Sequence, residues 1–303
     1  MTAPADVPIV AVVGATATGK SGLGLDLAER LDGEIINADA MQLYRGMDIG
    51  TAKLTPEQRR GIPHHQLDVL EVTEEASVAA YQEAAREDIA AIRRRGCVPI
   101  LVGGSGLYVR AALDRLEIPP TDPAVRGRLE AQATDAGAEA MYHLLRQRDP
   151  AAAAQIQPAN VRRIIRALEV IELTGRPFSA SMPSREFVAP AVVIGLSVHR
   201  SILDQRIDAR VEQMWRAGLR REVEGLLPLG LRDGFTASRA IGYAQAISVI
   251  DGQSTEPEAI GETGRATRRF ARRQESWFRP DPRIRWVEAT HGIEIDEVLA
   301  LVA

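Results

Sequence analysis

The chain has 303 residues, a length that suits one large domain or two. Apolar residues make up 45% and charged residues 26%, which excludes a disordered polymer and allows an ordinary hydrophobic core. The net charge of −4 excludes a uniformly basic nucleic-acid coat but leaves room for a local basic face. The single cysteine, Cys97, excludes an intramolecular disulfide and a cysteine-rich metal site.

The sequence carries no pattern of export or membrane insertion. Its N-terminus lacks a basic region, and the apolar run at residues 9–13 is too short for a signal core. No stretch approaches the roughly 20 apolar residues that a membrane helix needs. We therefore expect a protein of the reducing cytoplasm, with no membrane partner.

Strands and helices alternate in the first third of the chain. In chain order we predict a strand at 9–13, a helix at 21–31, a strand at 34–38, a helix at 78–95 and a strand at 98–102. This alternation predicts an α/β fold, a parallel sheet flanked by helices. Ligands bind such sheets beyond the carboxyl ends of the strands, where Asp39 and Ser105 fall.

The pattern changes at the proline-rich segment 118–123. Residues 119–190 are rich in alanine and arginine and contain no clear strand, so we predict an inserted all-helical subdomain there. Residues 1–118 and 191–303 then form the sheet core. In its second part we predict a strand at 192–198, helices at 201–227, 240–250 and 256–277, a strand at 284–287 and a final helix.

A phosphate-binding motif follows the first strand. It fits G-x-x-x-x-G-K-[ST] with Gly14, Ala15, Thr16, Ala17, Thr18, Gly19, Lys20 and Ser21. The glycines let backbone N–H groups curl around phosphate oxygens, Lys20 adds a charge, and Ser21 is a candidate ligand of Mg²⁺. The motif itself fits a nucleoside triphosphate and the diphosphate of another molecule equally well. A kinase also needs a metal-site carboxylate, and Asp39 is the nearest candidate.

The block from Asp39 to Lys53 is far more distinctive than the P-loop: Asp-Ala-Met-Gln-Leu-Tyr-Arg-Gly-Met-Asp-Ile-Gly-Thr-Ala-Lys. Together with the P-loop it closely resembles the tRNA dimethylallyltransferases. Further blocks agree in order and spacing over nearly the whole chain, at residues 64–68, 101–108, 162–170, 206–214, 240–245 and 266–277.

The resemblance implies a P-loop core with an inserted helical domain that contacts the tRNA anticodon stem-loop. It also implies a reaction, in which the dimethylallyl group passes from dimethylallyl diphosphate to the exocyclic amine of the adenosine immediately 3′ of the anticodon. The expected cofactor is Mg²⁺, held on Ser21. The chain looks like the compact bacterial type, because its single cysteine rules out the zinc finger of eukaryotic relatives. We expect a monomer.

Individual roles also follow from the resemblance. Asp39 is expected to accept the proton of the amine, and Ser105 and Arg210 are expected to contact the diphosphate. Contacts to tRNA are expected from Asp39, Ala40, Met41, Gln42, Ser105, Arg126, Arg162, Arg163, Arg166, Arg268 and Arg272.

The arginines at 265–279 alternate with aromatic residues and allow two interpretations. They suit phosphate contact along an RNA stem, or a solvated helix face above an aromatic core stripe, and the resemblance favours RNA. Two positions depart from the family. Ser105 stands where threonine is usual, which keeps the hydroxyl. Ala244 stands where many members have arginine, which removes one possible RNA contact.

Three other functions remain open on the sequence alone. A kinase of a small metabolite leaves the arginines unexplained, a non-catalytic RNA-binding module leaves the P-loop unexplained, and an adenylate prenyltransferase needs no extended RNA surface. The adjacent His64 and His65 favour a structural role over metal binding, because neighbouring side chains do not face the same way. For Asp48 and Asp68, salt bridges are favoured over ordering water around Mg²⁺.

Overall fold

The computed structural model describes residues 7–181 and 185–302, and the chain divides into two compact units. The core unit consists of Met1–Leu113 and Phe187–Ala303, and the inserted unit consists of Asp114–Glu186. The inserted unit thus begins and ends a few residues before the expected positions 119 and 190.

A sheet of six parallel strands organises the core unit, in the order β3-β2-β4-β1-β5-β6. The strands are β1 (Ile9–Gly14), β2 (Gly33–Asn37), β3 (His64–His65), β4 (Val98–Gly103), β5 (Ala191–Ser197) and β6 (Ile284–Glu288). Every residue of β1 is buried, as its unbroken apolar run predicts for a strand covered on both faces. The α/β fold is therefore confirmed.

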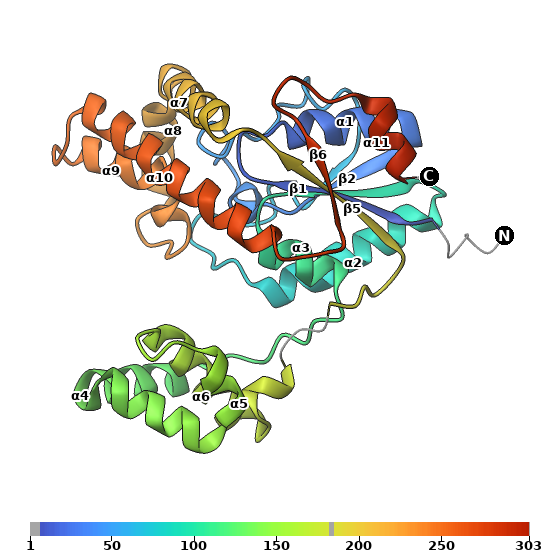
Figure 1. The fold of residues 1–303 in the computed structure, drawn as a ribbon. Helices are drawn as coiled ribbons and strands as arrows, with labels where there is room; N and C mark the ends of the chain where they lie inside the picture. The colour runs from blue at the N-terminus through green and yellow to red at the C-terminus, as the bar shows by residue number, and fades with distance from the viewer. Residues whose placement is uncertain (1–6, 182–184, 303) are drawn as a thin grey trace. The chain divides into compact units, whose positions relative to one another are not determined.

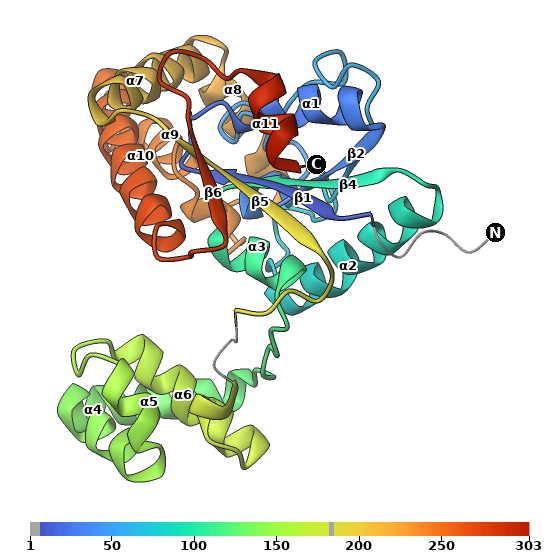
Figure 2. The same ribbon diagram turned by 45° about the vertical axis from the view of Figure 1, so that its right-hand side comes forward.

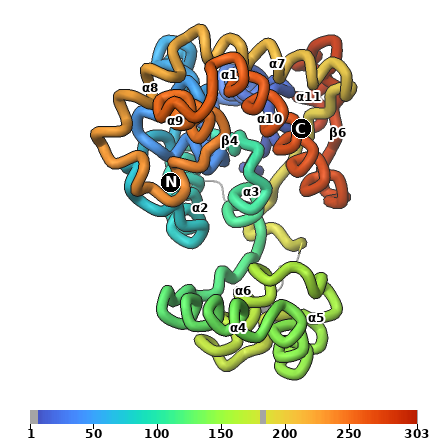
Figure 3. Tube along the Cα trace, turned by 90° about the vertical axis from the view of Figure 1, so that its left-hand side faces the viewer, coloured from blue at the N-terminus to red at the C-terminus, as the bar shows by residue number. Residues whose placement is uncertain are grey.

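Helices cover both faces of this sheet (Figures 1 and 2). One face carries α1 (Lys20–Leu31) and α11 (Ile295–Val302), and the other carries α2 (Val78–Arg94) and α3 (Gly106–Leu113). Beyond the carboxyl ends of the strands gather α7 (Arg200–Arg216), α8 (Leu219–Leu226), α9 (Tyr243–Ile250) and α10 (Glu256–Phe278), which face the viewer in Figure 3.

The prediction of one helix over 201–227 is wrong. The chain forms α7 and α8 instead, because Gly218 adopts a φ of 102° that ends helical geometry. The helix expected at 240–250 starts at Tyr243, after Gly242 with a φ of 92°. The sequence also did not predict β3 or α3.

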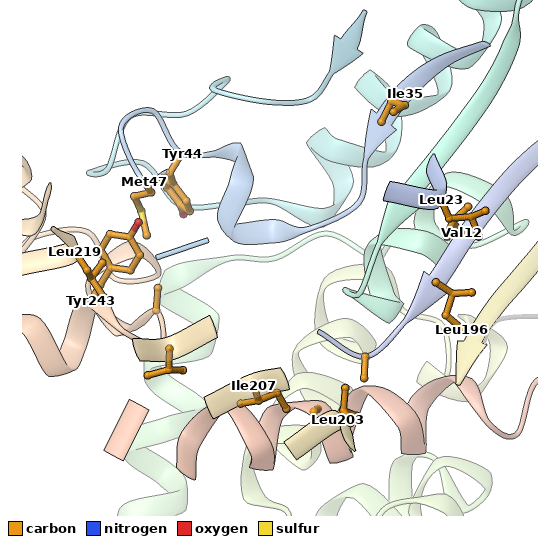
Figure 4. Packing of buried hydrophobic residues seen from close by; sticks show 14 of the residues in the cluster. Val12, Leu23, Ile35, Tyr44, Met47, Leu196, Leu203, Ile207, Leu219 and Tyr243 are labelled. Carbon is orange, nitrogen blue, oxygen red and sulfur yellow. The ribbon is translucent and has the colours of Figure 1, made fainter. Parts of the chain in front are cut away.

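Side chains from α8 and α9 anchor the long segment between β2 and β3. Met47 packs beside Leu219 and Tyr243 in the buried core (Figure 4). The Tyr243 hydroxyl donates to Glu222 at 2.5 Å, and the same carboxylate accepts the N–H of Ile49 at 2.8 Å. A Cβ at Gly50 would collide with the Tyr243 ring, so this position has no space for a side chain.

The inserted unit has a core of its own. It contains α4 (Pro123–Arg148), α5 (Pro150–Gln155) and α6 (Val161–Thr174), and α4 is broken at Gly137 with a φ of 83°. Leu129, Met141, Leu145 and Ile164 are among the residues that pack together inside it.

Two of the arginines expected at the RNA hold a buried carboxylate in this unit. Glu169 is fully buried and accepts hydrogen bonds from Arg126 at 2.9 Å, from Arg166 at 2.8 Å and from the N–H of Asp122 at 3.0 Å. Burial alone would raise the pKa of Glu169, yet the two arginines and the Asp122 N–H hold it below the usual 4.5.

We expect Glu169→Ala to destabilise the inserted unit by about 1–3 kcal/mol, because it leaves a buried N–H and two arginines without their acceptor. Hydrogen exchange of residues 114–186 should accelerate, with the core unit as internal reference. Glu172→Ala is the matched control, since Glu172 lies on the same helix and pairs with a more exposed arginine, Arg128. Equal exchange in both variants would contradict this account of Glu169.

Candidate active site

The loop between β1 and α1 folds into a cradle of backbone amides. Gly14, Ala17 and Gly19 have φ angles of 143°, 64° and 100°. Lys20 Nζ donates to the carbonyl of Ala15 at 2.5 Å and closes the loop on itself. The N–H groups from Ala17 to Ser21 donate to no acceptor in the described part of the chain, so they are available to an anion at the start of α1.

Two cavities of the core unit meet beside this loop. The first, of about 200 Å³, is lined by Lys20, Ser21 and other P-loop residues, and we call it the P-loop cavity. The second cavity, of about 330 Å³, has a more apolar lining that includes Met41, Met214 and Phe270. The residues that line both cavities define a junction: Thr16, Asp39, Thr51 and Arg210.

Two cations converge on the P-loop cavity, where Asp39 acts on both of them without forming a salt bridge with either. Burial, helped by the nearby Arg210 and opposed by Asp39, lowers the pKa of Lys20 from 10.5 to about 7. Burial also lowers the pKa of Arg210 below its ordinary value, again opposed by Asp39. Neither cation forms a salt bridge within residues 7–181 and 185–302. Such a pair favours the binding of a multiply charged anion.

Asp39 stands at the end of β2 and is held by its neighbours. Its N–H donates to Asn37 Oδ1 at 2.9 Å, and its Oδ1 accepts the N–H of Met41 at 3.0 Å, which caps a short 3-10 helix at Ala40–Leu43. The hydroxyl of Tyr81, on α2, donates to the carbonyl of Asn37 at 2.7 Å and holds the end of β2 in place. The carboxylate is thereby oriented at the junction, and its Oδ2 accepts no hydrogen bond from the described residues.

Ser105 lies beside this strand end, where its N–H donates to the carbonyl of Ala38 at 3.2 Å. Its Oγ accepts the N–H of Ala40 at 3.2 Å, which leaves the hydroxyl proton free to donate to a ligand. It lines the second cavity rather than the P-loop cavity, together with Ala40 and Met41. Gln42 lines the P-loop cavity, and its side chain donates to the carbonyl of Thr51 at 3.0 Å.

The sequence argument missed several residues that line the two cavities. Gln274 from α10 reaches the P-loop, where its Oε1 accepts the N–H of Thr16 at 2.8 Å. Phe270 and Arg273 from the same helix line the second cavity. These contacts join segments hundreds of residues apart, and no local pattern indicates them.

The remaining arginines differ in what they contact. On α10, Arg268 pairs with Asp208, whereas the exposed Arg272 has no ion pair among the described residues. On α6, Arg162 and Arg163 are exposed beside the start of the helix, and Arg166 holds Glu169.

The two histidines and two aspartates have different surroundings. His65 bonds Glu34 at 2.6 Å, and Asp88 raises its pKa. His64 lines the P-loop cavity, and its buried Nε2 has no hydrogen-bond partner in the part of the chain that the structure describes. Asp48 and Asp68 each pair with the buried Lys53 at 2.6 Å, as the salt-bridge interpretation predicts.

Residues 7–181 and 185–302 contain no cluster of three or more histidine, cysteine or acidic side chains that could hold a metal ion. Across the same residues, every helix is too short or too polar to cross a membrane.

Comparison with known proteins identifies the family. The family model described as IPP transferase matches residues 42–281. A tRNA dimethylallyltransferase of Kineococcus radiotolerans is 59% identical over 95% of this chain and 92% of its own. A second protein of that name, from Thermobifida fusca, is 58% identical over 97% and 94%.

Solved structures agree with the sequence comparison. A tRNA isopentenylpyrophosphate transferase of Bacillus halodurans is 41% identical, with a TM-score of 0.71 over 98% of this chain and 95% of its own. A eukaryotic dimethylallyltransferase acting on tRNA is 27% identical, with a TM-score of 0.81 over 94% and 74%. With a P-loop core of this form and relatives matched along almost its full length, the chain belongs to the IPP transferase family.

Proposed function

We propose that this protein transfers the dimethylallyl group from dimethylallyl diphosphate to the exocyclic amine of the adenosine immediately 3′ of the anticodon in tRNA. The observation that carries the proposal is the junction, where two cations beside a P-loop meet a carboxylate and a largely apolar second cavity. The named relatives act on tRNA, and this arrangement suits that chemistry. The enzyme works as a cytoplasmic monomer.

The P-loop cavity takes the leaving group. As the bond between the allylic carbon and the diphosphate oxygen breaks, its electron pair goes to the diphosphate. Lys20, Arg210 and the amides from Ala17 to Ser21 stabilise that charge, and the Ser105 hydroxyl donates to the oxygen that leaves.

The second cavity takes the acceptor base. A volume of about 330 Å³ lies within the range of small-molecule pockets, roughly 300–1,000 Å³, and its apolar and aromatic lining suits a base that has left its stack. The amine then faces Asp39 at the junction. Its nitrogen forms the new bond to the allylic carbon, and its proton passes to Asp39.

Mg²⁺ fits the site with Ser21 as its protein ligand. Ser21 lines the P-loop cavity at the start of α1, and Mg²⁺ commonly takes one or two protein ligands and completes its shell with phosphate oxygens and water. When bound there it supplies charge neutralisation to the diphosphate.

Arginines whose side chains are exposed or partly exposed provide the RNA contacts. In the core unit we assign this role to Arg272 and Arg268 on α10, to Met41 in the second cavity and to Gln42 in the P-loop cavity. In the inserted unit we assign it to Arg162 and Arg163, and to the outer faces of Arg126 and Arg166.

The reaction itself is tested by incubating the protein with Mg²⁺, labelled dimethylallyl diphosphate and unmodified tRNA. Label should enter the tRNA, but not a tRNA with uridine at the target position, and not AMP. Label on AMP would identify an adenylate prenyltransferase. Phosphate transfer from labelled ATP, without prenyl transfer, would identify a kinase.

Asp39→Asn removes the proton acceptor but keeps the size of the side chain and its cap on Met41. We expect turnover to fall about 10²- to 10⁴-fold, the usual worth of general-base help, while tRNA affinity changes little. Single-turnover rates and filter binding of tRNA measure the two quantities separately. An equal loss of rate and affinity would contradict the role of Asp39 as the base.

Binding of pyrophosphate should be linked to a proton on Lys20. With a pKa of about 7, this amine is mostly neutral at pH 8, and diphosphate oxygens favour its charged form. At pH 8 the wild type should take up close to one proton more than Lys20→Arg does, and at pH 6 this difference should vanish. Calorimetry in two buffers of different ionisation enthalpy measures the uptake, and equal uptake by both proteins at pH 8 would refute the linkage.

Arg272→Ala should weaken tRNA binding and reduce the slope of log K against log salt by about one, as loss of one phosphate contact does. The control is Arg30→Ala, which removes the same charge from α1, where Arg30 pairs with Asp296. An unchanged slope for Arg272→Ala, or an equal change in the control, would count against α10 as an RNA surface.

A further inference from the structure

Phe235 and Arg239 form a stacked pair at the edge of the second cavity. The guanidinium carbon of Arg239 lies 3.9 Å from the centre of the Phe235 ring. Arg239 is an exposed residue and also lines the second cavity, so the pair stands where this cavity opens to solvent. Phe235 is 58% exposed, more than Trp277 at 48% or Trp286 at 41%. An exposed ring therefore supports a charged group at the mouth of the cavity that we assign to the acceptor base.

The backbone that carries this pair is anchored to the core unit. A Cβ at Gly234 would collide with the carbonyl oxygen of Val72, so the chain passes directly against that segment. Ala237 is fully buried, and a 3-10 helix at Ala237–Arg239 gives the turn a regular geometry. The stack of ring and guanidinium thus stands on a fixed part of the chain, although both side chains are exposed.

The guanidinium of Arg239 has no protein anion to neutralise it. Its side chain forms no hydrogen bond and no ion pair within residues 7–181 and 185–302. Arg232, on the same segment, differs in this respect, because both oxygens of Asp251 hold it at 3.0 and 2.6 Å. Arg239 is therefore supported on one face by a ring, and its opposite face and its N–H edge are available to a ligand.

The reaction itself leaves a partner for such a face. An adenine that enters the second cavity leaves its stack, and each base beside it then loses one stacking partner. A neighbouring nucleotide is joined to the target through a single phosphate, so its base stays within reach of the mouth of the cavity. Proteins hold such unstacked bases on aromatic rings and on the planes of arginine side chains. A phosphate would use only the N–H edge of the guanidinium, whereas a base uses the planar face that stacking on Phe235 orients.

We propose that Arg239, supported by Phe235, stacks against the base next to the target adenosine and holds it beside the mouth of the second cavity. Arg239 touches the RNA, and Phe235 acts through Arg239 as a positioning residue. The inference rests on the proposed function, because it takes the second cavity as the pocket of the target adenine. It deepens that function by assigning a subsite to a second base of the same RNA.

The test measures the affinity of the full-length protein for RNA stem-loops that carry the target adenosine, by filter binding over a series of salt concentrations. One RNA is intact, a second has an abasic ribose on the 5′ side of the target, and a third has it on the 3′ side. The proteins are the wild type, Arg239→Lys, Phe235→Leu and a matched control, Arg232→Lys. Arg232 is exposed on the same segment and lines neither cavity. All three substitutions change exposed side chains and keep the net charge.

Arg239→Lys and Phe235→Leu should each weaken binding of the intact RNA by about fivefold, the lower end of the effect of stacking one base. With one of the two abasic RNAs the difference between these variants and the wild type should vanish, because the base that Arg239 contacts is missing. The slope of log K against log salt should be the same in all four proteins, since no phosphate contact is lost. Arg232→Lys should match the wild type with every RNA.

Full affinity of either variant for the intact RNA would overturn this inference and leave the proposed function intact. A loss that persists with both abasic RNAs would also overturn it, because the stacked pair would then contact the RNA backbone. An equal loss in Arg232→Lys would do the same, since the effect would come from the segment in general. Failure of the wild type to transfer the dimethylallyl group to the intact stem-loop would instead remove the proposed function, and the inference with it.

Discussion

The site depends on two positive charges that face the same cavity, neither of them paired in a salt bridge among the described residues. Lys20 sits at the start of α1, and Arg210 reaches it from α7, more than half the chain away. Bringing them together costs free energy in the absence of a ligand, since each loses hydration and repels the other. The stability of the sheet and its helices offsets this free energy. A bound polyanion relieves the repulsion between the two cations, and this relief contributes to its affinity.

Much of the core and part of the site follow from local sequence patterns. Residues 14–21 carry a P-loop because one strand, one glycine-rich turn and one helix suffice to build it, and Asp39 is placed by the strand that it ends. The break at Gly218 was missed because its flanks keep helical periodicity. A strand of two residues, His64–His65, is too short to show any period.

Contacts between distant segments lie beyond that reasoning. Gln274 reads in the sequence as an ordinary polar position on an amphipathic helix, and only the packing of α10 brings its amide to Thr16. Predicting RNA contacts by counting arginines in the sequence fails for the same reason, because the count does not show what each arginine contacts. Arg126 and Arg166 hold the buried Glu169 between them, which leaves only their outer faces for RNA, so an arginine cluster must be judged by its partners as well as by its charge.

The entry and exit of the inserted unit have a consequence for the history of this chain. The N–H of Val188 donates to the carbonyl of Leu113 at 2.8 Å, and the N–H of Arg115 donates to the backbone carbonyl of Glu186 at 2.8 Å. The two segments that link the core unit to the inserted unit therefore run side by side. The inserted unit has a core of its own and its two ends adjoin, so it takes the place of a single loop of the core unit. A unit inserted in this way can be gained, lost or exchanged as a whole, because a short turn between Leu113 and Val188 is enough to close the core unit without it.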